Sequence, residues 1–171
     1  MRVAPAAFLA RSAREVIELA RRVTAVTHDH PDGLKGAEAT ALAIWLARDG
    51  ASPPEIAARI EADYGLDLSE SVDEIRRRYR YSELCLETAP EAIVCALKAE
   101  SFEDALRNAV SLGGDADTLA AIAGAVAEPL FGIPEAVRAD ALSRLDDRLR
   151  SVFHRFEAMA MQAQESGHKP R

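Results

Sequence analysis

The sequence predicts an all-α fold, built as one compact domain of many helices. Apolar residues recur at spacings of three and four along most of the chain, and Ala and Leu dominate these positions. Serine, glycine and proline stand where successive helices should begin and end, whereas few stretches alternate as strands do. We therefore expect a single helical domain over residues 1–162 and a disordered polar tail over residues 163–171.

Start and stop signals define the predicted helices in order. Ser12, with Glu15 three residues later, forms a capping box for the first helix. Ser52 and the two prolines after it start the third helix, and Gly65 ends it. Pro129 falls late in the seventh helix and predicts a kink there. The predicted helices span residues 13–25, 34–48, 52–65, 71–78, 90–99, 102–112, 117–131 and 134–161, with a break in the last near residue 143.

Composition and charge narrow the class of protein. The chain has 171 residues and a formal net charge of -7, which favours solubility and argues against broad electrostatic binding to nucleic acid or to an anionic membrane. No apolar stretch reaches the length of a membrane-spanning helix. Cys85 and Cys95 are too few for a disulfide framework, which indicates reduced thiols. The sequence therefore predicts a cytoplasmic protein with no nucleic-acid and no membrane partner.

The stretch GGDADT places three oxygen-bearing side chains at the start of a predicted helix. Asp115, Asp117 and Thr118 follow two glycines that let the backbone turn tightly. One interpretation is an acidic helix start, because free N–H groups and the helix dipole favour a capping oxygen and negative charge. The other is one side of a site for a hard cation such as Mg²⁺, which prefers oxygen ligands. The spacing leaves both interpretations open.

The stretch THDHPDG, between the first two predicted helices, is the second candidate. As a plain turn it would supply Asp29 or Asp32 as the cap of the following helix. As a binding turn, one of His28 and His30 would hydrogen-bond a ligand phosphate or ribose. Gly33 and Gly36 would then open a helix whose free N–H groups favour an anion. The two histidines are two residues apart and make a poor pair of metal ligands.

The run RRRYRY, residues 76–81, mixes basic and aromatic side chains, as single-stranded nucleic-acid binders do. The same cations at the end of a predicted helix complement its dipole, and in an acidic chain we favour that interpretation. Cys85 follows closely, but no local pattern supplies the base that a cysteine nucleophile needs. We therefore expect Cys85 to be a packed thiol.

Taken in order, these segments resemble the ADP-ribosylglycohydrolase family. THDHPDGLKGAEATALAIWLAR resembles the family's histidine turn and the helix after it, and SLGGDADTLAAIAGAVAEPLFGIP resembles its second metal motif. The similarity covers about residues 1–134. It implies an all-helical fold that hydrolyses a glycosidic bond to ADP-ribose. In that family two Mg²⁺ ions, for which Mn²⁺ is an alternative, hold the distal ribose and a water.

The resemblance also assigns residues to roles. It implies that Asp115, Asp117 and Thr118 are metal ligands, with Asp117 as the bridge between the ions. It implies that His28 contacts ADP-ribose, and it leaves the acid–base carboxylate unassigned. Further residues that it implies in shaping the ligand turn are His30, Asp32, Gly33 and Lys35.

One family feature has no counterpart in this sequence. Family members carry an N-terminal Thr-Asp-Asp motif that supplies the other metal ligands, and no such tripeptide occurs here. We therefore expect the chain to correspond to the C-terminal half of the family domain, truncated, and to need a complementing N-terminal half or self-association for activity. The alternative is a non-catalytic helical binding or structural domain that pairs with itself or with a complementing chain.

Overall fold

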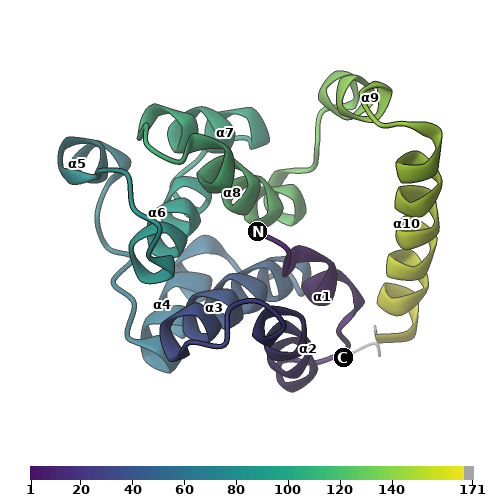
Figure 1. Cartoon of the computed structure of the whole chain (residues 1–171), viewed down its shortest axis with the longest axis horizontal. Coiled ribbons are helices and arrows are strands. Elements are labelled where there is room, and N and C mark those ends of the chain that lie inside the picture. Colours follow the sequence, from purple (N-terminus) through teal and green to yellow (C-terminus); the bar gives the residue numbers. More distant parts are fainter. Residues whose placement is uncertain (168–171) are drawn as a thin grey trace.

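The computed structural model describes residues 1–167 and confirms the all-α prediction, since over these residues it has ten helices and no strand (Figure 1). None of the described helices is long and apolar enough to cross a membrane. The helices are α1 (Ala4–Leu9), α2 (Ala13–Ala25), α3 (Pro31–Arg48), α4 (Pro53–Tyr64), α5 (Val72–Arg78), α6 (Cys85–Leu97), α7 (Phe102–Ser111), α8 (Ala116–Phe131), α9 (Glu135–Ser143) and α10 (Asp147–Gly167).

Serine side chains begin several helices at the positions where the sequence predicts helix starts. Ser12 accepts a hydrogen bond from the backbone N–H of Glu15 at 3.2 Å at the start of α2. Ser101 accepts one from the backbone N–H of Asp104 at 3.1 Å at the start of α7. Each such cap stabilises its helix by about 1 kcal/mol. The bounds of α2 agree with the predicted helix over residues 13–25.

Other helix boundaries differ from the predicted ones. The sequence analysis expects no helix at α1, and α3 begins earlier than predicted, at Pro31. α6 begins at Cys85, so Pro90 lies inside this helix and does not start it. The N-cap residue of α6 is Leu84, whose side chain cannot cap, and the sequence therefore carries no start signal there. The predicted break near Ser143 separates α9 from α10.

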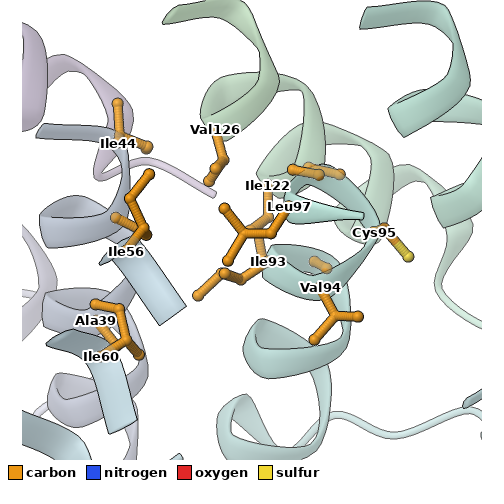
Figure 2. Close-up of a cluster of buried hydrophobic side chains, with 14 of the residues drawn as sticks. Ala39, Ile44, Ile56, Ile60, Ile93, Val94, Cys95, Leu97, Ile122 and Val126 are labelled. Carbon is orange, nitrogen blue, oxygen red and sulfur yellow. The ribbon is translucent and has the colours of Figure 1, made fainter. Parts of the chain in front are cut away.

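The core lies where α3, α6 and α8 meet. Leu42 and Ile44 of α3 are fully buried, as are Ile93 of α6 and Leu119 of α8. Figure 2 shows side chains of α3 and α4 on one side of this core and side chains of α6 and α8 on the other. Burying each large aliphatic side chain contributes about 1.5–3 kcal/mol. The helices that follow the two candidate motifs, α3 and α8, are therefore anchored in the most buried part of the molecule.

The last two helices lie to one side of this core (Figure 1). α10 contacts α1, where the rings of Phe8 and Phe156 meet edge to face with their centroids 6.3 Å apart. Pro129 lies inside α8, which continues to Phe131 before Gly132 turns the chain towards α9. α10 extends into the predicted tail as far as residue 167. Residues 168–171 lie outside the described residues, so the disordered tail stays a prediction.

Candidate active site

A cavity of about 400 Å³ lies between the starts of α3 and α8. The C-terminal turn of α2, the N-terminal segment 1–3 and the start of α6 with the segment that leads into it form its other walls. It brings together residues that are distant in the sequence: His28 and Gly33 from the histidine turn, and Asp115 and Thr118 from GGDADT. The hydroxyl-bearing side chains among its other lining residues are Thr24, Thr27, Thr40, Ser82 and Thr88.

Two glycines set the backbone path into α8. Gly113 and Gly114 both have positive φ, +76° and +63°, which is the left-handed conformation that favours glycine. A Cβ atom on Gly114 would lie 3.0 Å from the ring of Tyr79 and 3.2 Å from the backbone of Tyr81. The glycine pair therefore lets the chain pass close to both tyrosines and enter the helix at Asp115.

Asp115 occupies the N-cap position of α8, but its side chain does not cap the helix. Its backbone carbonyl accepts the N–H of Leu119 at 3.0 Å, while its carboxyl group accepts no hydrogen bond from the first turn. Ser12 and Ser101 differ, because their side chains do accept such bonds. The acidic-cap interpretation of GGDADT thus explains the position of Asp115 but gives its carboxyl group no part in capping the helix.

Asp117 lies in the first turn of α8. Its Oδ1 accepts the backbone N–H of Thr118 at 2.9 Å. Hydrogen bonding with the carboxyl group of Asp115, and then with this N–H group, lowers the pKa of Asp117. The carboxyl groups of Asp115 and Asp117 therefore lie within hydrogen-bonding reach of each other at the start of α8.

The cavity does not include all three predicted metal ligands. Asp115 and Thr118 line it, whereas Asp117 does not. Among residues 1–167, no three His, Cys, Asp or Glu side chains are grouped closely enough to hold a metal ion. GGDADT thus offers part of an oxygen-ligand set, and the metal role of its residues stays a prediction.

His28 lines the cavity and is held by the turn that ends α2. Its backbone N–H donates to the carbonyl of Thr24 at 2.9 Å, and its Nδ1 lies 2.7 Å from Oγ1 of Thr27. Gly33 lies against the same backbone, since a Cβ atom there would be 3.3 Å from the carbonyl oxygen of His28. The histidine predicted to contact the ligand is therefore in the cavity together with Gly33.

His30 has a different place, as the N-cap of α3. Its Nδ1 accepts the backbone N–H of Asp32 at 3.2 Å. The expectation that Asp29 or Asp32 caps this helix is wrong, because Pro31 sets the first helical position and leaves the residue before it as the cap. His30, Asp32 and Lys35 do not line the cavity, and their role in shaping the ligand turn stays a prediction.

The sequence analysis misses the wall formed at the start of α6. Glu83 adds a carboxylate to the cavity, and its Oε1 accepts a hydrogen bond from the Tyr81 hydroxyl at 3.1 Å. Cys85 lies in the space that a side chain on Gly36 would need, and burial raises the pKa of its thiol. This agrees with the predicted packed thiol. No local pattern marks these residues, because only the packing of α3 against α6 brings them to the cavity.

Two arginines of the RRRYRY run make internal contacts. Arg76 donates to Oγ of Ser111 at 2.7 Å. Arg78 pairs with Glu70 and, at 2.8 Å, with the buried carboxylate of Glu91. Burial raises the pKa of Glu91, and the guanidinium of Arg78 opposes that rise. These contacts give the basic run a structural use, and the absence of nucleic-acid binding stays a prediction.

Several known proteins are similar to this chain. A family model described as ADP-ribosylglycohydrolase matches residues 1–169. An uncharacterized protein of Archaeoglobus fulgidus is 34% identical, over 79% of this chain and 50% of its own length. ADP-ribosylhydrolase ARH3 of Bos taurus and that of Mus musculus are each 29% identical, over 79% of this chain and 49% of their length. The chain thus spans about half the length of these relatives.

Proposed function

This chain belongs to the ADP-ribosylglycohydrolase family, and from that premise we propose that it serves Mg²⁺-assisted hydrolysis of a glycosidic bond between ADP-ribose and a modified substrate. The relatives named ADP-ribosylhydrolase support the substrate class. One observation carries the proposal. Asp115 and Thr118 share a cavity with His28, and the carboxyl group of Asp115 is not used to cap its helix.

The residues at the start of α8 fit one side of a cation site. Asp115, Asp117 and Thr118 offer carboxylate and hydroxyl oxygens, the donor type that Mg²⁺ prefers and Mn²⁺ accepts. The carboxyl groups of Asp115 and Asp117 lie within hydrogen-bonding reach of each other, so their oxygen atoms are close in space. When bound, the ion would orient ribose hydroxyls and lower the pKa of a bound water.

Other residues of the cavity would bind and enclose the ligand. Nδ1 of His28 is engaged by Thr27, which leaves Nε2 for a ligand oxygen. Ala37, Ala89 and Ile122, from α3, α6 and α8, form apolar parts of the wall. Excluding water from such a wall strengthens the hydrogen bonds and charge interactions made inside the cavity.

We propose further that the remaining metal ligands and the acid–base carboxylate come from a second segment of polypeptide. The chain spans about half the length of its relatives, and the described residues group no third ligand with the α8 carboxyl groups. A complementing N-terminal half or a second copy of the chain would supply them. The alternative, a non-catalytic helical domain that pairs in the same way, differs because it predicts no metal binding.

Calorimetric titration of Mg²⁺ or Mn²⁺ into the purified chain, with and without ADP-ribose, tests the proposal. We expect saturable binding that ADP-ribose strengthens and that Asp117→Ala weakens at least about 10-fold, since a charged ligand is lost. Asp73→Ala is the matched control, because Asp73 is also an exposed acid in the first turn of a helix but lies in α5, paired with Arg76.

The outcomes separate the candidate functions. Metal binding lost only in Asp117→Ala would support the metal role and justify an assay for release of ADP-ribose after a complementing half is added. A folded chain that binds neither metal would refute the metal role and leave GGDADT as a helix start. Equal metal affinity in Asp117→Ala and Asp73→Ala would contradict the assignment of ligands.

A further inference from the structure

We propose that Thr27 is a positioning residue, whose hydroxyl group donates to Nδ1 of His28 and thereby fixes the imidazole as an Nε2–H donor in the cavity. The ligand atom that this donor would meet is an acceptor oxygen. The identity of the ligand as ADP-ribose, with its phosphoryl oxygens, rests on the proposed function. The action of Thr27 on the ring rests on the geometry of the turn.

The backbone of the turn holds His28 in place before any ligand binds. The carbonyl oxygen of Thr24 accepts the N–H groups of both Thr27 and His28, at 3.0 Å and 2.9 Å. Gly33 approaches so closely that a side chain there would press on the His28 backbone. Two hydrogen bonds and one close contact therefore fix the backbone position from which the His28 side chain extends.

The side chain of Thr27 then restricts the ring. Its Oγ1 lies 2.7 Å from Nδ1 of His28, a normal distance for a hydroxyl hydrogen bond. In a neutral imidazole one nitrogen donates and the other accepts, and the partner of one nitrogen sets the role of the other. Within residues 1–167, Oγ1 of Thr27 makes no other hydrogen bond, so its proton is available to Nδ1. When this hydroxyl group donates to Nδ1, as we propose, Nε2 carries the ring proton.

His30, the other histidine of this turn, makes a different hydrogen bond and lies outside the cavity. Nδ1 of His30 also accepts a hydrogen bond, but from the backbone N–H of Asp32, and this bond caps α3. His30 does not line the cavity, whereas Thr27 and His28 both do. The two histidines of THDHPDG therefore have different roles. His30 stabilises the start of α3, and His28 presents a hydrogen-bond donor to the cavity.

The donor of His28 matters because of the other charged groups that line the cavity. Asp115 and Glu83 bring acceptor oxygens, and Arg2 brings a cation from the N-terminal segment. An Nε2–H group at His28 adds a donor without adding a charge. The wall thus combines a donor for a ligand oxygen with the carboxyl group predicted to hold a metal.

Long-range ¹H–¹⁵N correlation spectra of the histidine rings test the inference directly. The chain has four histidines, and the His28→Gln variant assigns the signals of His28 by their loss. At a pH where the ring is neutral, we expect the Nε2–H tautomer in the wild type. Thr27→Val should convert it to a mixture, and Thr27→Ser, which keeps the hydroxyl group, should restore it. Thr27 is exposed, so all variants should fold, and thermal unfolding checks this. If Thr27→Val does not fold, Thr27→Ala takes its place.

Affinity for ADP-ribose, measured on the same variants, separates this inference from the proposed function. We expect Thr27→Val to weaken binding about 3- to 10-fold and Thr27→Ser to stay within about 2-fold of the wild type, as the loss of one hydrogen bond predicts. An Nδ1–H tautomer in the wild type, or an unchanged tautomer in Thr27→Val, would overturn the inference even if ADP-ribose binds. The expected spectra without any ADP-ribose binding would uphold the role of Thr27 and contradict the proposal that this cavity by itself binds ADP-ribose.

Discussion

The two ends of α8 carry carboxyl groups in opposite surroundings. At the N-terminal end, hydrogen bonding with the carboxyl group of Asp115 and with a backbone N–H lowers the pKa of Asp117. At the C-terminal end, burial raises the pKa of Glu128, and the guanidinium groups of Arg138 and Arg48 oppose that rise. The helix dipole favours negative charge at the first end and disfavours it at the second.

Under the proposed function, this difference would let one helix serve ligand binding at one end and tertiary structure at the other. At the start of α8 the helix dipole favours negative charge, and the carboxyl group of Asp115 makes no capping hydrogen bond. At the other end, Glu128 shares a second cavity, of about 350 Å³, with Phe8, Arg48 and Arg138. Negative charge is tolerated there because two arginines from α3 and α9 face it.

The largest expected effect concerns the turn that leads into the N-terminal end. Gly114→Ala places a Cβ atom at φ +63° and within 3.0 Å of the Tyr79 ring, so both backbone strain and overpacking oppose it. We expect a loss of about 2–4 kcal/mol in the free energy of unfolding, measured by urea denaturation. Gly113→Ala is the matched control: its φ is also positive, but nothing lies within 4 Å, and about 1–2 kcal/mol should be lost. Equal losses would show that the tyrosines do not confine the turn.

A smaller effect distinguishes a capped helix start from an uncapped one. Ser101→Ala removes a side-chain cap from α7 and should lower the free energy of unfolding by about 1 kcal/mol. Asp115→Ala removes no capping bond, so its cost should fall to a few tenths of a kcal/mol once salt screens the helix dipole. Urea denaturation of both variants measures the difference. It is done in about 0.5 M salt, because that concentration screens surface charges. A larger loss in Asp115→Ala would mean that its carboxyl group does stabilise the helix.

The smallest effect is the pH dependence at the C-terminal end. A carboxyl group whose pKa is raised in the folded state makes that state less stable once the group ionises, so the wild type should lose stability as pH rises through the ordinary and then the raised pKa of Glu128. Glu128→Gln removes this dependence and should be more stable than the wild type at pH 7, by a few tenths of a kcal/mol after solvent screening. The two proteins should converge at pH 3.5. A variant that is less stable at pH 7 would show that the two arginines outweigh burial.

The sequence predicts the helices that carry their own start signals. α2 and α7 begin directly after serines that cap them, and both were expected within a residue or two of their observed bounds. α6 begins after Leu84, which gives no local signal, so packing decides its start. Pro90 then misleads, because it is common in a first turn yet here lies further inside the helix.

The candidate site divides in the same way. Motif resemblance is enough to name His28 and Asp115, and the fold brings both to one cavity. It does not predict Glu83 or Cys85, because their place depends on how closely α3 approaches α6. The cap at His30 also escapes the pattern, since histidine is an unusual N-cap and only the position of Pro31 reveals it.

Cys85, which packs closely against Gly36, is a thiol in the cavity wall that a chemical reagent can modify. Cys95, the other cysteine, is buried and has a pKa raised to about 12, so it should react far more slowly with alkylating reagents. Cys85 is only partly buried and lies in the cavity wall. The rate at which an iodoacetamide reagent modifies the unaltered protein therefore reports whether the cavity is filled, and a protecting compound can be found without knowing the reaction.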